Sequence, residues 1–404
     1  MEMTFSKKLF YFFPVLFCFC LPFGTFIVSV IIVLWLLTSF FNFSGENFRQ
    51  GIRKQGFLAM VAFFLLTCIS AAFSANGAEA LTAIEIKLSC IIFPYLLFCF
   101  NWPLQILKRC VISFVSGCFF ACLYLIARAS LYAFAGEPQY FFYSLFSDLI
   151  HASYFAMYLN LAIAFVLVLY NQWFSTQKSI IYSSYFFVAI FVAAIFLCSS
   201  KLGLISLFLC LPLIFAYKFR QALNAKRVLI LVAGVVILFL LASKVFPGPF
   251  ERLNSIVSVS GSDLDKTSSE STTVRILIWE QSLTIIKNNL FFGTGVGDAN
   301  DALYEAYRLN GLTGAYDHRF NAHSQYFQTF IGMGLLGFAL LLLLTFGNLI
   351  KAILTKQFLP LVFSLLIVLN FFVESMLQTS AGVVFFAFFY CFFSRVNERQ
   401  LLGD

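Results

Sequence analysis

The stretch LFYFFPVLFCFCLPFGTFIVSVIIVLWLLTSFF, from Leu9 to Phe41, contains no charged residue and decides the fold class. A helix crosses the hydrocarbon core of a bilayer with about 20 apolar residues, so this stretch is too long for one crossing. Pro22 and Gly24 interrupt it near the middle. Because both residues disfavour a continuous helix, the stretch predicts a hairpin of two membrane helices, roughly 8–21 and 24–42.

The whole chain of 404 residues shares this character, since 61% of its residues are hydrophobic and only 11% are charged. An average globular domain carries about 25% charged residues. So few charges exclude a soluble enzyme, a disordered chain and a secreted disulfide scaffold. The bilayer core offers backbone groups no water to bond, so apolar runs of this length predict helices. The predicted fold is therefore an all-α polytopic membrane protein.

About twelve membrane helices are predicted in total. After the first two, further spans are expected near 56–74, 84–100, 108–132, 151–170, 179–198, 202–217, 228–246, 325–348, 358–375 and 378–394. Basic residues such as Lys108 and Arg109 gather in every second connection, whereas Arg128 and Lys201 fall on the opposite side. Under the positive-inside rule this pattern places both termini in the cytoplasm. The net charge of +8 is thus mainly a signal of topology and gives no reason to expect nucleic acid as a partner.

One long extracytoplasmic loop separates the predicted spans nine and ten. The chain is therefore expected to divide into nine membrane helices over 1–246, the loop over 247–322, and three further helices with a short cytoplasmic tail over 323–404. The loop holds half of the 18 acidic residues of the chain and two of its three histidines, His318 and His323. This concentration of polar residues makes the loop the first place to search for function.

Two short helices are predicted within the loop. Four apolar residues give its middle part the period of an amphipathic helix, namely Ile276, Trp279, Leu283 and Ile286. This helix is expected over 274–287 and a second one over 298–309. The glycine-rich run at 293–298 lacks the context of a nucleotide-binding fold, so it is interpreted as a turn. Asp298 and Asp301 are too few carboxylates for a complete cation site.

Three ionisable residues fall near the outer ends of predicted spans, where charge in lipid is costly. His151 starts the sixth span, Lys201 lies between the seventh and eighth, and Glu374 lies near the end of the eleventh. Each has an ordinary alternative: a helix cap for His151, a lone topological exception for Lys201, and helix pairing for Glu374. All three fall on the same side as the long loop, which predicts one outward-facing polar site beneath it.

Arg275 and His323 are the loop residues best suited to chemistry. Arg275 shares a helix face with Trp279, and a guanidinium binds phosphate oxygens through two donors at once. His323 lies where the loop re-enters the membrane, and a neutral imidazole accepts a proton from a hydroxyl. The ordinary alternatives are a solvated arginine on an amphipathic helix and a structural histidine at a boundary.

The order of these motifs resembles the O-antigen ligase and polymerase family of bacterial envelope glycosyltransferases. The matching segments are VRILIWE (274–280), NNLFFGTGVG (288–297), NAHSQYFQ (321–328) and GMGLLG (332–337), with SSKLG (199–203) upstream and Glu374 downstream. Two positions depart from the family pattern. Lys201 stands where the family usually has arginine, and Ser324 follows His323 where the family usually has asparagine.

The resemblance implies a bacterial inner-membrane enzyme that moves a glycan from polyprenyl diphosphate to an acceptor hydroxyl on the periplasmic side. It implies His323 as the base and Arg275 as the cation that stabilises the leaving diphosphate. The residues implied in binding the diphosphate or the glycan are Lys201, Arg275, His151, Trp279, Glu374 and His318. Lipids surround the chain, and neither a metal nor a cofactor is expected, because the loop has no convincing carboxylate cluster.

Two related activities, a ligase and a polymerase, differ in the acceptor that receives the glycan. A ligase transfers the glycan to lipid A–core, which the chain length, the single dominant loop and the motif order favour. A polymerase transfers it to a second lipid-linked repeat. A transporter is the alternative of another class, since about twelve spans also suit one. The polar candidates gather at one face rather than at the bilayer midplane, which favours the transferase.

Overall fold

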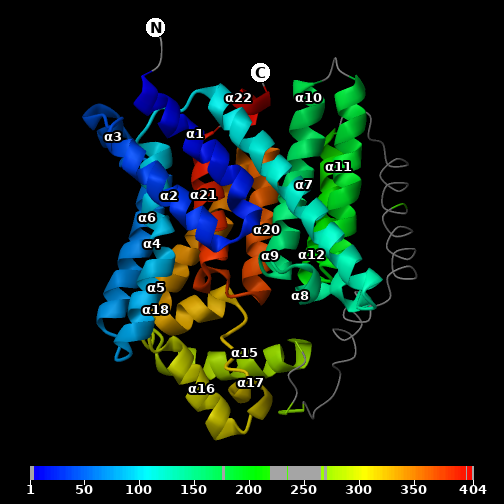
Figure 1. Ribbon diagram of the computed structural model, residues 1–404. Helices are drawn as coiled ribbons and strands as arrows, with labels where there is room; N and C mark the ends of the chain where they lie inside the picture. The colour runs from blue at the N-terminus through cyan, green and yellow to red at the C-terminus, as the bar shows by residue number, and fades with distance from the viewer. Residues whose placement is uncertain are drawn as a thin grey trace.

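The computed structural model describes five segments and one isolated residue, namely 4–174, 178–218, 265–267, 271–396, 398–402 and Gly234. Every regular element in these residues is a helix, which confirms the predicted all-α class. The helices form a bundle with a smaller group of helices at one end (Figure 1).

The first part of the bundle consists of α1 (Phe5–Cys20), η1 (Leu21–Phe23), α2 (Thr25–Phe40), α3 (Gly45–Gly51), α4 (Gln55–Ala72), α5 (Gly77–Lys87), α6 (Ser89–Phe98) and α7 (Leu104–Phe134). Helices α1 and α2 pack against each other, as expected for the predicted hairpin. The chain reverses through η1, which contains Pro22 and is followed by Gly24 at a φ of 114°. Helix α1 also packs along α7, and α4 packs along α6.

The next part consists of η2 (Pro138–Phe141), α8 (Tyr143–Phe146), α9 (Ala152–Phe165), η3 (Val166–Tyr170), α10 (Asn171–Trp173), α11 (Lys178–Leu197) and α12 (Lys201–Lys218). Helix α9 is central, because each of its residues is buried. It packs against α7, α11 and α12. A helix that is enclosed on every side forms part of a close-packed core, so the start of α9 is a fixed platform.

The group of helices at the end of the bundle, here called the cap, consists of α15 (Ser271–Asn288), α16 (Ala299–Asn310) and α17 (Thr313–Asp317). It has an apolar core of its own, which includes Val274, Ile278, Leu303 and Tyr307. Helix α16 confirms the second of the two predicted loop helices. The predicted glycine-rich turn is also confirmed, because that run connects α15 to α16.

The last part consists of α18 (Gln325–Leu342), η4 (Leu343–Gly347), α19 (Asn348–Leu354), α20 (Phe358–Val373), η5 (Met376–Gln378), α21 (Ser380–Arg395) and α22 (Glu398–Leu402). Helix α18 is kinked at Gly334, whose φ is 61°. A Cβ at Gly334 would lie only 2.3 Å from the Phe291 carbonyl oxygen, so glycine is required there. The Leu335 N–H donates to the Leu290 oxygen across the kink at 2.9 Å.

The glycine-rich turn joins the cap to the bundle. The Thr294 N–H donates to the Ile331 oxygen of α18 at 2.7 Å. The Val296 N–H donates to Ser70 Oγ of α4 at 3.0 Å. The turn therefore fixes the cap against two membrane helices through its backbone, which explains why residues without bulky side chains recur in it.

Helix α15 buries only part of the predicted apolar stripe. Of the four apolar residues that defined its expected stripe, Ile276 and Leu283 are exposed, at 39% and 47%. Val274 and Ile278 are buried instead, together with Ser282. Of the other two predicted residues, Ile286 is buried in the core of the cap and Trp279 packs against it, so the prediction is correct in part.

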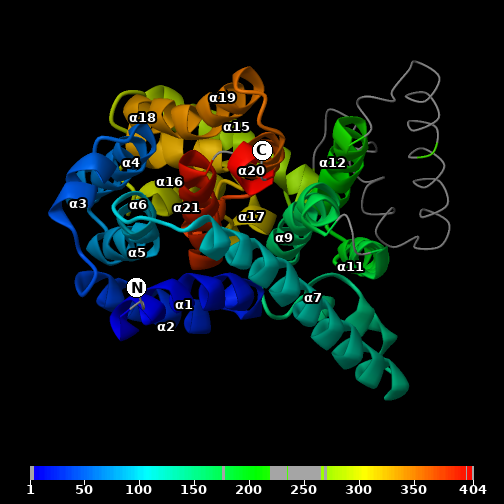
Figure 2. The same ribbon diagram turned by 90° about the horizontal axis from the view of Figure 1, so that it is seen from above.

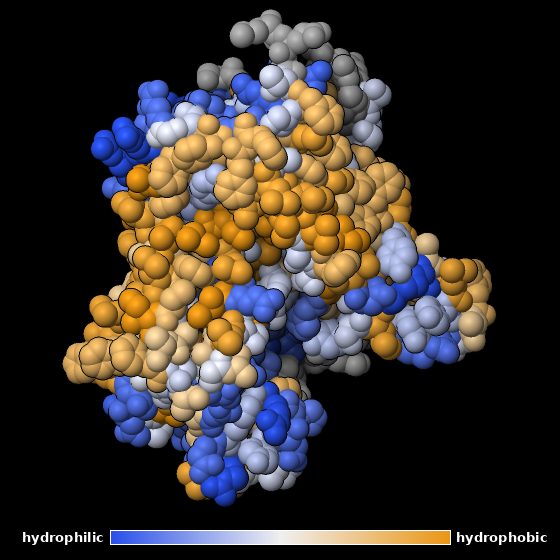
Figure 3. Space-filling view, turned by 60° about the vertical axis from the view of Figure 1, so that its left-hand side comes forward, coloured by the Kyte–Doolittle hydropathy of each residue, from blue (hydrophilic) through white to orange (hydrophobic). Residues whose placement is uncertain are grey.

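Seven helices in the described residues are long and apolar enough to cross a membrane. Four shorter apolar helices also coincide with predicted spans, namely Thr25–Phe40, Tyr182–Leu197, Phe358–Val373 and Ser380–Arg395. The predicted span at 228–246 lies outside the described residues, so the total of twelve stays a prediction. On the face drawn in Figure 3, an apolar band covers the bundle, and hydrophilic residues gather on the cap and at the opposite end.

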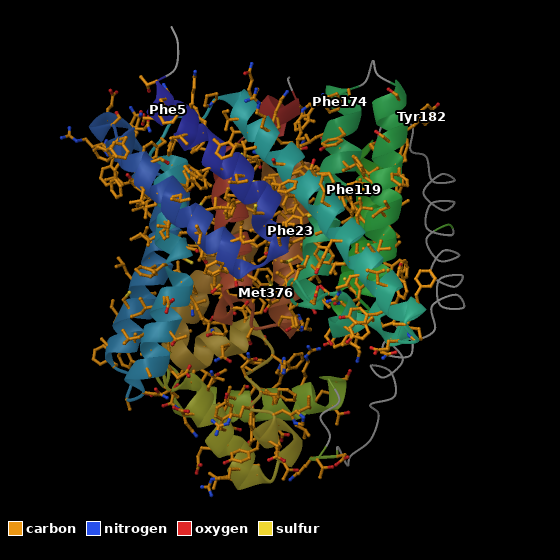
Figure 4. All side chains as sticks on the ribbon, viewed as in Figure 1. Phe5, Phe23, Phe119, Phe174, Tyr182 and Met376 are labelled. Atoms are coloured by element: carbon orange, nitrogen blue, oxygen red, sulfur yellow. The ribbon has the colours of Figure 1, made fainter. Side chains whose placement is uncertain are left out.

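The first and last described helices lie at the same end of the bundle. Helices α1 and α22 are both at the end opposite the cap (Figure 1). Phe5, Phe174 and Tyr182 also lie toward that end, whereas Met376 lies nearer the cap (Figure 4). The arrangement agrees with an even number of crossings, and it puts the cap and the ends of the chain on opposite faces.

Candidate active site

A cavity of about 320 Å³ lies where the cap meets the bundle. Its walls come from the starts of α9 and α12, from α15 and from the residues at the end of α20. Four residues that the sequence analysis singled out line it, namely Lys201, Arg275, Trp279 and Glu374. The structure therefore brings together candidates from distant parts of the chain.

Arg275 and Glu374 form an ion pair in the wall of this cavity. Arg275 Nη2 lies 3.1 Å from Glu374 Oε1, and the two side chains are 19% and 14% exposed. A guanidinium has five N–H donors. Among the described residues, Glu374 is the one hydrogen-bond partner of the Arg275 side chain. The remaining N–H donors of the guanidinium can therefore bind a ligand.

Two serines hold the carboxylate of this pair. Ser153 Oγ donates to Glu374 Oε1 at 3.4 Å. Ser200 Oγ donates to Ser153 Oγ at 3.3 Å and accepts the Gly203 N–H at 3.1 Å. The chain of hydrogen bonds runs from the start of α12 through the start of α9 to Glu374. The orientation of Arg275 is thus set by rigid elements of the bundle.

Lys201 supplies the second cation of the cavity. It begins α12, and its Nζ donates to Thr272 Oγ1 at 2.8 Å. Thr272 belongs to the first turn of α15, so this bond connects the bundle to the cap. The turn before α12 is tight, since Ser199 has a φ of 48°. Where the family usually has arginine, this chain retains the positive charge through lysine.

His323 occupies a strained turn between α17 and α18. Its φ is 44°, a left-handed conformation that residues other than glycine rarely adopt. Its N–H donates to Asn321 Oδ1 at 2.9 Å. A conformation of this kind persists only where the surrounding structure imposes it, and such residues concentrate at functional sites.

Two buried glutamines impose this conformation. Gln328 Oε1 accepts the Ala322 N–H at 2.9 Å, immediately before His323. Gln325 Oε1 accepts the Leu377 N–H at 2.6 Å. Gln325 is fully buried and Gln328 is 3% exposed. The first bond fixes the start of the turn to α18, and the second fixes α18 to the segment that follows Glu374.

The imidazole of His323 is neutral at pH 7. Burial, followed by the positive charge of Arg275, lowers the pKa of His323 from 6.5 to about 4, although the charge of Glu374 opposes this shift. His323 does not line the cavity. It nevertheless belongs to the same group of charges, because Arg275, Glu374 and His151 all act on it electrostatically.

His151 is the N-cap of α9. Its Nδ1 accepts the Ser153 N–H at 3.4 Å, which is the capping role considered from the sequence. Its ring lies 5.4 Å from the ring of Tyr154. His151 does not line the cavity, so its contact with a substrate stays a prediction.

Trp279 and His318 contact the neighbours of His323. Trp279 Nε1 donates to the Ala322 oxygen at 3.1 Å, which joins α15 to the His323 turn. The ring of His318 stacks on Phe320 at 5.3 Å, and Phe320 contacts the ring of His323 at 5.0 Å. His318 lies outside the cavity lining, and its role in binding glycan stays a prediction.

Asp298 and Asp301 bind the turn between α4 and α5. Asp298 accepts the N–H groups of Ala75 and Asn76 at 2.8 and 2.7 Å, and Asp301 accepts from Asn76 Nδ2 at 2.8 Å. These carboxylates therefore anchor the cap. Within the described residues no group of three or more His, Cys, Asp or Glu side chains is placed to hold a metal. Metal independence stays a prediction for experiment.

The sequence analysis overlooked the residues that position the site, namely Ser153, Ser200, Gln325 and Gln328. A signal for the glutamines was present, because two amides three residues apart open an otherwise apolar helix. Polar groups buried in that way need specific partners. The serines had no signal beyond their closeness to His151 and Lys201.

A comparison with known protein families gives a match for part of the chain. No match was found among curated proteins. Residues 185–342 match the family model described as O-antigen ligase. This range contains Lys201, Arg275 and His323, whereas Glu374 and the serine at the start of α9 lie outside it. The match confirms the resemblance seen in the motifs: over residues 185–342 the chain is similar to the O-antigen ligase family.

Proposed function

We propose that the protein is a membrane glycosyltransferase that moves a glycan from polyprenyl diphosphate to an acceptor hydroxyl. In this proposal the chain lies in a bacterial inner membrane with both termini in the cytoplasm. Residues 247–322 form the periplasmic loop between the membrane helices of 1–246 and those of 323–404. The cap, and the cavity beneath it, then face the periplasm, where the lipid-linked donor is presented.

One observation carries the proposal: two cations line one cavity at the end of an apolar bundle, and the charge of one of them acts on a nearby neutral histidine. Lys201 and Arg275 line a single cavity of about 320 Å³. Their charges suit a diphosphate, which becomes more negative as it leaves. His323, with its pKa lowered to about 4, is free to accept the proton of a hydroxyl. Apolar residues of α12, among them Leu202 and Ile205, also line the cavity and offer contacts to a lipid tail.

The reaction breaks the bond between the anomeric carbon and the diphosphate oxygen, and it forms a bond between that carbon and the acceptor oxygen. The hydroxyl proton passes to His323, and the electron pair of the broken bond stays on the diphosphate beside Arg275 and Lys201. Donor binding brings negative charge to Arg275, which raises the pKa of His323 and makes it a better base. Glu374 holds Arg275 in position throughout.

Lipid A–core is the acceptor that we favour, because the matching family model is described as O-antigen ligase. A polymerase would use the same donor site and the same base, with a second lipid-linked repeat as acceptor. The two activities differ only in the acceptor, so an assay must offer both.

The decisive experiment uses the purified protein, a defined glycan on polyprenyl diphosphate, and lipid A–core together with a second lipid-linked repeat. Glycan attached to lipid A–core supports the ligase, whereas an elongated lipid-linked product assigns the polymerase. In proteoliposomes, movement of the donor across the bilayer without any new glycosidic bond would contradict the proposal and support a transporter.

A further inference from the structure

A second cavity, of about 150 Å³, lies near the face opposite the candidate active site. It is enclosed by the end of α19, the first turn of α20 and the last turn of α21. Its polar lining consists of Asn348, Lys351, Thr355, Gln357, Ser394 and Arg395. So many hydrogen-bonding groups around one space favour a polar ligand over an empty packing defect.

The charge of this cavity is positive. Lys351 and Arg395 supply two cations, and no acidic residue among the described ones lines it. The nearby carboxylate of Glu398 is buried, and it accepts the Leu359 N–H at 2.9 Å. That carboxylate is therefore engaged at the start of α20. A ligand with negative charge fits the two cations, and arginine is suited to binding the oxygens of a phosphate.

Helix α19, which lines the cavity, also has an apolar outer face. Helix α19 lies at the outer edge of the bundle when the molecule is seen from above (Figure 2). Three of its apolar side chains, Ile350, Ile353 and Leu354, are exposed at 55%, 55% and 76%. These three side chains lie on the side of α19 opposite to Lys351 and Ala352, so one face of the helix lines the cavity and the other exposes apolar residues.

We propose that this cavity binds the phosphate of an anionic phospholipid, whose acyl chains stay in the bilayer beside the bundle. Basic pockets between membrane helices near the cytoplasmic surface bind anionic headgroups. From the sequence, the basic residues of this face are markers of topology. In the structure two of them, Lys351 and Arg395, line one cavity. The site lies far from the candidate active site and does not depend on glycosyl transfer.

The test measures lipid retained by the full-length protein after purification in detergent. Phosphatidylglycerol is the probe, and native mass spectrometry counts the bound molecules. Lys351→Gln removes one cation of the cavity, and Lys356→Gln is the matched control, because Lys356 is an exposed neighbour that does not line it. We expect the affinity for phosphatidylglycerol to fall about fivefold in Lys351→Gln and to stay unchanged in the control.

Three results overturn the proposal. Equal losses in Lys351→Gln and Lys356→Gln show general attraction to basic residues rather than a site. Equal retention of phosphatidylcholine shows that the charge of the headgroup is not recognised. Displacement of the lipid by millimolar inorganic phosphate assigns the cavity to free phosphate. Lys351 is exposed at the surface, so its replacement leaves the fold intact and the outcome readable.

Discussion

The Leu377 N–H donates to Gln325 Oε1 across 2.6 Å, and this bond joins two segments 52 residues apart in the sequence. Gln325 follows the candidate base His323 by two residues, and Leu377 follows Glu374 by three. One buried amide therefore sets the position of the base relative to the carboxylate that orients Arg275. The bond therefore connects the segment that contains His323 to the segment that contains Glu374.

Replacing Gln325 by methionine should slow transfer without weakening the binding of the donor. The variant keeps the volume of the side chain but loses the bonds to Leu377 and Thr329, so the His323 turn is held less firmly against the segment after Glu374. A displacement of about 1 Å in a reacting group costs on the order of 10²-fold in rate. We expect kcat to fall by up to about that factor, while KM for the donor changes little.

Gln281→Met is the matched control for this variant. Gln281 is also a buried glutamine near the cap core, where its Oε1 accepts from Asn310 Nδ2 at 2.9 Å, but it has no bond to the His323 turn. Equal losses in the two variants would show a general effect on folding and contradict the positioning role of Gln325.

Arg275→Gln should lower the rate of transfer by about 10²–10³-fold, the usual cost of removing one group that stabilises the charge of a leaving oxygen. Arg275→Lys should fall between this variant and the wild type, since it keeps the charge but loses the paired donors. Arg308→Gln is the control, because Arg308 forms an exposed ion pair with Glu305 at 2.6 Å within the same cap. Wild-type activity in Arg275→Gln would refute the assigned role.

Lys201→Gln should weaken binding of the donor by about 10–100-fold, which corresponds to one hydrogen bond to a charged group. Lys201→Arg should retain most of the affinity. Lys201 also donates to Thr272, so Thr272→Val tests whether the lysine acts only as a tether to α15. Donor titrations that give the same loss for Thr272→Val and Lys201→Gln would show a tether and exclude a diphosphate ligand.

Transfer should continue in EDTA, because Lys201 and Arg275 supply the positive charge that a metal provides in other phosphate-transfer sites. The assay is the rate of product formation before and after dialysis against EDTA. Complete loss of activity that Mg²⁺ restores would contradict this expectation and indicate a metal site.

The membrane helices were largely predictable from the sequence, since burial in lipid requires long apolar runs. Helix α9, for example, lies within the span expected at 151–170. The identity of the charged candidates followed from the scarcity of charge itself. Their pairing was not predictable, because Arg275 and Glu374 are 99 residues apart and a single sequence carries no record of tertiary contacts.

Helix α15 shows where the period of a pattern is not enough. Its apolar residues lie on two faces, with Ile278 buried in the cap and Ile276 lining the cavity. A stripe drawn through Ile276 and Leu283 has the spacing of a helix, but burial is decided by the neighbours of the helix. The roles of Gln325 and Gln328 could not be predicted for the same reason, because their hydrogen-bond partners come from other segments.

The histidines offer a direct test of the electrostatics, because the chain has only three. Selective ¹³C labelling of histidine should give three signals, and the one lost in His323→Gln identifies the base. We expect this signal to remain that of a neutral ring from pH 7 down to about pH 4. Arg275→Gln should raise the pKa of His323, because the positive charge of Arg275 lowers it, whereas Glu374→Gln should lower it further.

The same shift predicts how the rate depends on pH. The imidazole accepts a proton only in its neutral form, so kcat/KM, which reports the free enzyme, should be constant from neutral pH down to about pH 5 and fall near pH 4. In the complex the diphosphate offsets the charge of Arg275, so the pKa of His323 rises and the fall in kcat should begin at a higher pH. His323→Gln should lose about 10²–10⁴-fold in kcat and this acidic limb with it. A free enzyme that titrates near pH 6.5, or a kcat limb that persists in His323→Gln, would assign proton transfer to another group.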